Sequence, residues 1–119
     1  GFSTSSDTWL PMPDDWAHLT VAAQDASADS TLTLYREAIR IRSTWPGTTA
    51  PGGAGPGVHW HDTFDGCLVF GREGGSVVCM INTSRRSVPL PDGDVVLASG
   101  PLDGGRLPAD TAAWIRPTR

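Results

Sequence analysis

The sequence predicts a mainly β protein: a small antiparallel β-sandwich preceded by a loop and one α-helix. Three observations predict this class. A two-residue period begins at Val58, and short apolar runs follow it to the end of the chain. The 14 Gly and 10 Pro residues favour short strands and turns over long helices. Helical periodicity is confined to one stretch, residues 30–45.

The N-terminal 28 residues are expected to form a loop, because Ser, Thr, Asp and Pro cluster there and Pro11 and Pro13 exclude a helix interior. Asp29 or Ser30 is the expected N-cap of a helix that ends near Thr44, before Pro46-Gly47. Its apolar side chains cover about half of the circumference, which predicts contact with two bodies. Trp45 is expected to dock on the sandwich. Arg42 falls inside the apolar arc and should find a partner there.

From Val58 onward the sequence predicts about six short strands with turns between them, the pattern of a sandwich or barrel. Gly71–Gly75 has the composition of a hairpin turn between two apolar runs. The Gly-rich and Pro-rich residues 47–56 read as a linker. The strands are expected near Val58–Phe64, Cys67–Phe70, Val77–Ile81, Val88–Leu90, Val95–Ala98 and Ala112–Ile115.

Charge and cysteine content narrow the possible functions. A formal net charge of -4 argues against nucleic-acid binding, and no apolar run is long enough to cross a membrane. Cys67 and Cys79 lie in apolar runs and are expected to be buried free thiols in a cytoplasmic protein. Asn82-Thr83-Ser84 matches a glycosylation sequon, which we interpret as a chance match.

Four N-terminal motifs carry a family resemblance. They are Gly1-Phe2-Ser3, Trp9-Leu10-Pro11, Val21-Ala22-Ala23-Gln24, and the helix from Ser30-Thr31-Leu32 through Tyr35-Arg36 to Ile41-Arg42. Together they resemble the last βα-loop and final helix of the barrel in α-amylase-family glycoside hydrolases of the α-glucosidase and oligo-1,6-glucosidase branch. Val95–Leu102 is similar to a strand near the end of domain C in the same enzymes.

The resemblance implies that residues 1–46 are the end of a catalytic barrel and residues 57–119 a C-terminal β-sandwich, domain C. The intact enzyme would hydrolyse α-glucosidic bonds of small oligosaccharides with retention and without a cofactor. Its upstream barrel would be the partner of this chain and would bind the substrate. Phe2 and Trp9 would then lie on the active-site side of the barrel, at the substrate entrance.

The chain itself offers no catalytic or metal-binding constellation. Retaining glycosidases need two carboxyl groups flanking the scissile bond, and the nearest pair, Asp62 and Asp65, reads as turn residues. His59 and His61 would share a strand face, but zinc needs a third and usually a fourth ligand. We therefore predict no catalytic residue and no metal, and expect the chain alone to be inactive.

Two other functions remain open from the sequence. The first is a carbohydrate-binding module, since Trp rings stack on sugars; it would need two aromatic side chains on one exposed face. The alternation of Trp60 with Val58 and Phe64 argues against such a pair, and Trp60 and Trp114 are expected to be core or barrel-facing. The second is a self-associating assembly module, in which exposed apolar surface of the helix meets another copy.

Overall fold

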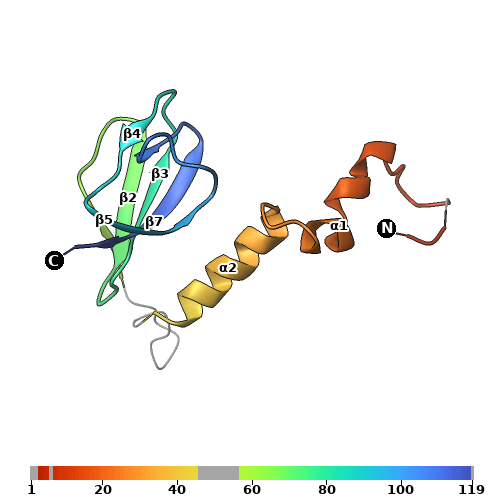
Figure 1. Cartoon of the computed structure of the whole chain (residues 1–119), viewed down its shortest axis with the longest axis horizontal. Coiled ribbons are helices and arrows are strands. Elements are labelled where there is room, and N and C mark those ends of the chain that lie inside the picture. Colours follow the sequence, from red (N-terminus) through yellow and green to blue (C-terminus); the bar gives the residue numbers. More distant parts are fainter. Residues whose placement is uncertain (1–2, 6, 46–56, 119) are drawn as a thin grey trace. The chain divides into compact units, whose positions relative to one another are not determined.

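The computed structural model describes residues 3–5, 7–45 and 57–118 (Figure 1). By its internal contacts the chain divides into two compact units, Gly1–Arg40 and Ile41–Arg119. The division falls inside the long helix α2, Thr31–Ser43, so the last turn of this helix belongs to the second unit. The linker expected at residues 47–56 lies outside the described residues.

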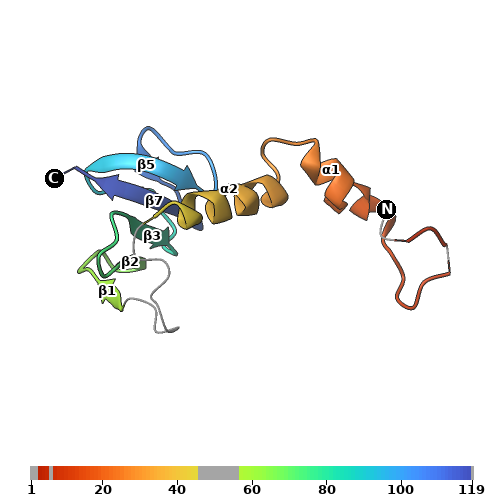
Figure 2. The same ribbon diagram turned by 90° about the horizontal axis from the view of Figure 1, so that it is seen from below.

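The second unit is built on a five-stranded antiparallel sheet with the strand order β1-β2-β3-β7-β5 (Figure 2). Strand β7, the last in the sequence, lies between β3 and β5. A two-stranded sheet of β4 and β6 forms the second layer. The strands are β1 Val58–Trp60, β2 Cys67–Arg72, β3 Val78–Asn82, β4 Val88–Pro89, β5 Gly93–Ala98, β6 Arg106–Leu107 and β7 Thr111–Pro117.

The hydrophobic core lies between the two layers. Alternate residues of the large sheet point into it, as Val69, Met80 and Ala113 do from directly paired positions of β2, β3 and β7. Val88 and Leu107 close the core from the small sheet. The predicted small antiparallel β-sandwich is therefore confirmed. The one strand that the sequence did not indicate is β6, which has only two residues.

Asn82 joins the two layers at one end of the sandwich. Its side chain is 0% exposed and closes strand β3. The amide nitrogen donates to three carbonyl oxygens, those of Arg86 at 2.9 Å, Leu107 at 3.0 Å and Pro108 at 2.8 Å. The amide oxygen accepts from the backbone N–H and hydroxyl of Ser84. A buried side chain with every polar group bonded leaves no room for a glycan, so the sequon is a chance match.

The expected hairpin joins β2 to β3, with Phe70 paired to Cys79 and Gly71 to Val78. Gly74 adopts a positive φ of 72°, which glycine accommodates without strain. A second glycine, Gly93, is required by close approach: a Cβ there would lie 2.3 Å from the carbonyl oxygen of Arg116 on β7. Gly74 lies in the turn between β2 and β3, and Gly93 is the first residue of β5.

The first unit contains a 3-10 helix η1, Asp14–Leu19, and a short helix α1, Val21–Asp25, before α2 begins. The prediction of an unbroken loop over residues 1–28 is therefore wrong at these two segments. Pro13 precedes the first helix instead of interrupting it. The hydroxyl of Thr20 accepts a hydrogen bond from Ala23 N at 3.2 Å and so caps the second.

Polar side chains hold the first unit together. Gln24 donates to the carbonyl of Leu19 at 2.7 Å and accepts from Leu32 N at 3.0 Å, so it ties η1 to the start of α2. Ser30 caps α2, as predicted, by accepting from Thr33 N at 3.2 Å. Among the described residues up to Arg40, only Thr20 is buried. This unit is therefore ordered by hydrogen bonds rather than by a core of its own.

In the described ranges, none of the helices has both the length and the apolar character that crossing a membrane requires.

We predict that Asn82→Ala lowers the free energy of unfolding by about 2 kcal/mol, because it removes a buried amide that bonds three carbonyl oxygens and leaves the buried Leu107 carbonyl without this donor. Urea unfolding followed by Trp fluorescence measures the change. Arg85→Ala, an exposed substitution in the adjacent turn, is the control and should change stability by less than about 0.5 kcal/mol. An Asn82→Ala loss below about 1 kcal/mol would contradict this role for the amide.

Candidate functional site: the outer face of the sandwich

The large sheet has a second face that the small sheet does not cover, which we call the outer face. Because directly paired residues point the same way, the register defines it. Trp60 pairs with Phe70, Phe70 with Cys79, Cys79 with Trp114, and Trp114 with Leu97. One row across all five strands therefore carries apolar side chains, and three of them are aromatic.

A second row on the outer face continues this apolar surface. Leu68 pairs with Ile81, which pairs with Ala112. Trp60 is 61% exposed, and its ring centroid lies 5.2 Å from that of Phe70. Leu68 is also exposed, and Ile81 is half-buried. An apolar surface of this kind is typical of a face that meets another molecule or domain.

Trp60 is therefore exposed, which excludes the core position expected for it and leaves the barrel-facing one as a prediction. Its aromatic neighbour on the adjacent strand, Phe70, is half-buried rather than exposed. The register of the Gly71–Gly75 hairpin fixes which β3 residue Phe70 meets, and strand alternation places Leu68, Phe70 and Arg72 on one face. These two signals were present in the sequence and could have shown the aromatic pair.

A pocket of about 240 Å³ opens on the outer face, and we call it the outer-face pocket. The side chain of Trp45, which follows the end of α2, forms one wall; its ring centroid lies 5.0 Å from that of Trp114. The expected docking of Trp45 on the sandwich is thus confirmed. The side chains that line the pocket include Arg42, Trp45, Phe70, Arg72, Val77 and Trp114.

Two guanidinium groups border the outer-face pocket. Arg42 and Arg72 are both exposed, and neither forms an ion pair with another described residue. The partner expected for Arg42 inside an apolar arc is thus absent from the described part of the chain, and exposure to water removes the need for one. The pocket therefore combines an apolar, aromatic wall with positive charge.

Both cysteines are free thiols, as predicted. Cys67 is 7% exposed and lies in the core, whereas Cys79 is half-buried and lines the outer-face pocket. Burial raises the pKa of the Cys79 thiol, and its hydrogen bond with the Trp114 side chain opposes this rise. Burial also raises the pKa of the Cys67 thiol, against the opposing charge of Arg86. Neither thiol is activated as a nucleophile near neutral pH.

The raised thiol pKa values predict that stability falls at alkaline pH. Unfolded thiols lose their protons near pH 8.5, whereas the folded ones keep theirs to higher pH, so above about pH 8.5 the folded state binds more protons. Below that pH the ionisation of the two thiols should not change the free energy of unfolding. Above it the free energy of unfolding should fall as the pH rises. Urea unfolding from about pH 7 to 10 measures the slope. The double variant Cys67→Ala, Cys79→Ala should have a shallower slope; an unchanged slope would contradict the assignment.

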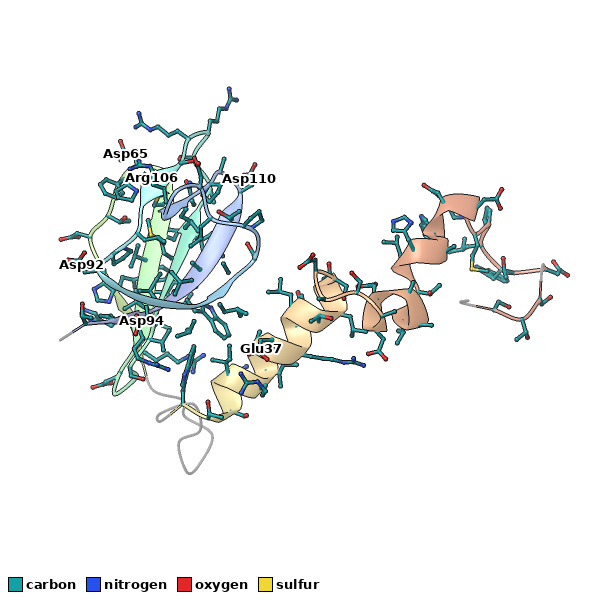
Figure 3. The ribbon with its side chains drawn as sticks, in the orientation of Figure 1. Glu37, Asp65, Asp92, Asp94, Arg106 and Asp110 are labelled. Atoms are coloured by element: carbon teal, nitrogen blue, oxygen red, sulfur yellow. The ribbon has the colours of Figure 1, made fainter. Side chains whose placement is uncertain are left out.

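The substrate-entrance role expected for Phe2 and Trp9 stays a prediction. Phe2 lies outside the described residues, and Trp9, in the first unit, is 98% exposed. Asp62 and Asp65 are exposed on the connection between β1 and β2, and Figure 3 shows Asp65 at the surface of the sandwich. The Phe64 carbonyl accepts from Cys67 N at 3.0 Å, which makes this segment a turn, as the sequence indicated.

His59 of β1 and His61, which directly follows this strand, lie with their ring centroids 4.9 Å apart in an edge-to-face arrangement. Within the described ranges, no three His, Cys, Asp or Glu side chains come together in a way that could hold a metal ion. The two histidines therefore contact each other at the edge of the sheet.

A comparison with solved structures finds an enzyme that this chain resembles. The chain is similar to the α-glucosyl transfer enzyme XgtA, with a TM-score of 0.56 and 25% sequence identity. The match covers 91% of this chain and 22% of XgtA, so the chain spans about a fifth of that enzyme. No protein-family model and no curated protein sequence matches the chain. The likeness establishes a glycosidase-like fold for these residues.

Proposed function

We propose that this chain is the C-terminal, non-catalytic part of an α-glucosidase-like enzyme. Residues 1–46 would complete its catalytic barrel, residues 47–56 would link, and residues 57–119 would form domain C. The observation that carries this proposal is the match to XgtA, an α-glucosyl transfer enzyme, which spans nearly the whole chain but only a fifth of that enzyme. The match supports a domain of a carbohydrate-active enzyme, and the N-terminal motifs favour the α-glucosidase branch.

The surface of the first unit supports the barrel part of the proposal. Tyr35 and Ile39, four residues apart on α2, are each 65% exposed, and Val21 is 66% exposed. Large apolar side chains seldom remain exposed together on an isolated protein. A barrel formed by preceding residues would cover them. Trp9, on the βα-loop of that barrel, would then face the active-site side with Phe2.

The outer face supports the domain C part. The aromatic row from Trp60 to Trp114 would pack on the catalytic body and remove this apolar surface from water, which stabilises both parts. Domain C would thus act through stability, and catalysis would depend on two carboxyl groups elsewhere in the enzyme, one as nucleophile and one as acid and base. Asp62 and Asp65 are suited to their turn and not to this chemistry.

A second candidate function is carbohydrate binding by the sandwich itself. The adjacent rings of Trp60, which is exposed, and Phe70, which is half-buried, favour it, because two adjacent aromatic rings can stack on the faces of sugars. In this alternative the outer face binds oligosaccharide in place of a catalytic body.

The proposal predicts the size and activity of the native polypeptide. An antibody against residues 57–118 should isolate, from the cells that make this protein, a polypeptide several times longer than 119 residues. That polypeptide should release glucose from maltose or isomaltose, and NMR of the first product should give the α-anomer, as retention requires. The 119-residue chain alone should release none under the same conditions.

Competition by excess purified chain is the control for antibody specificity. A native polypeptide of the length of this chain would overturn the proposal, as would a longer one that leaves both α-glucosides intact. The double variant Asp62→Asn, Asp65→Asn controls for contamination of the purified chain. Glucose release that is the same in this variant and disappears on further purification would come from a contaminant and would not contradict the prediction.

A further inference from the structure

The charged side chains that line the outer-face pocket are hydrogen-bond donors. Among the described residues that line it, Arg42 and Arg72 are charged and Ser76 carries a hydroxyl, and none has a carboxylate or amide side chain. A guanidinium has five N–H donors and no acceptor, so the charged part of this lining can only donate. Donors of this kind are complementary to a group that accepts on several atoms.

This inventory discriminates between classes of ligand. Sugar hydroxyls both donate and accept, so a sugar site needs side-chain acceptors, and the described lining residues offer the Ser76 oxygen as their only oxygen acceptor. An ionised carboxylate only accepts, and guanidinium groups bind it with short, charge-assisted and often bidentate hydrogen bonds. Two positive groups on one pocket also repel each other, and a bound anion between them removes that repulsion.

The apolar residues of the pocket indicate what kind of chemical group carries the anion. Trp45, Phe70 and Trp114 give the pocket flat apolar surfaces, with Val77 and Cys79 between them. A carboxylate alone would leave these walls in contact with water. A carboxylate attached to a flat apolar group would satisfy the arginines and cover the rings together.

We propose that the outer-face pocket binds a carboxylate carried on an apolar group, namely an Asp or Glu side chain next to an aromatic one on the catalytic body. That this side chain comes from a catalytic body rests on the proposed function, whereas the preference of the pocket for a carboxylate on an apolar group does not. The pocket is continuous with the aromatic row, through the shared residues Phe70 and Trp114, so a body that covers the outer face would also fill the pocket.

The test titrates the 119-residue chain with phenylacetate, observed by ¹H–¹⁵N NMR. We expect saturable shifts of the Trp45 and Trp114 indole signals and of the Gly75 and Ser76 amides. The dissociation constant should be about 5 mM, as a ten-atom ligand of ordinary efficiency gives. Phenylacetamide has the same shape without the charge and should bind at least about fivefold more weakly. Maltose is the third probe and should leave these signals unchanged.

Matched variants locate the anion. Arg42→Gln and Arg72→Gln should each weaken phenylacetate binding by about fivefold and leave phenylacetamide binding nearly unchanged. Arg85→Gln removes the same charge from an exposed turn outside the pocket and should have no effect. A dispersed spectrum verifies that each variant is folded.

Equal binding of phenylacetate and phenylacetamide would overturn the proposal, as would equal effects of the Arg72 and Arg85 substitutions or the absence of binding at about 50 mM. Shifts with maltose alone would identify a carbohydrate site instead. The outcome is independent of the native polypeptide's activity. A short, inactive native chain with a charge-selective pocket would refute the domain role and keep the carboxylate site.

Discussion

The sandwich depends on one buried amide. Asn82 ends the central strand β3, and its side chain supplies donors to carbonyl oxygens of the following turn and of the segment after β6. The carbonyl oxygens of Arg86 and Pro108 also accept from the hydroxyls of Ser84 and Thr111, whereas the Asn82 amide is the side-chain donor to the buried Leu107 carbonyl. Loss of the amide would leave that carbonyl buried without this donor, at a cost of about 1–3 kcal/mol. The small second layer can therefore exist because a side chain, rather than a longer strand, completes its hydrogen bonding.

The two faces of the large sheet differ, because the small second layer covers one of them. The inner face has a core around Met80 and Leu107, whereas the outer face carries an exposed Trp60 and a ring, Trp114, that packs against Trp45. The first unit has the same character, with a polar network around Gln24 and apolar side chains turned outward. Both units thus bond the buried side-chain polar groups of their described residues while keeping apolar area exposed. That combination suits parts of a larger assembly better than an independent protein.

Much of this architecture follows from the sequence by local rules. Strand alternation, the glycine-rich hairpin and the Ser30 cap predict the sheet and the main helix because each depends on neighbouring residues only. The two-residue strand β6 and the role of Asn82 depend on segments about 25 residues apart, and no local pattern encodes such a pairing. The outer-face pocket was missed for the same reason, since it joins the end of α2 to three strands. The short helices at Asp14 and Val21 were missed because two prolines obscured their starts.

The position of Asn82 also divides the sandwich into an end where chain length is fixed and an end where it is free. An extra residue in the turn at Ser84–Arg86, or before Pro108, would move a carbonyl away from the amide, so insertions there should not survive in related sequences. The β2–β3 hairpin at the opposite end bonds instead to the exposed Gly57, whose carbonyl accepts from Glu73 N at 3.0 Å. Its tip, at Glu73 and Gly74, can lengthen without disturbing the core. Because this hairpin borders the outer-face pocket, divergence at its tip could remodel the pocket while the fold stays constant.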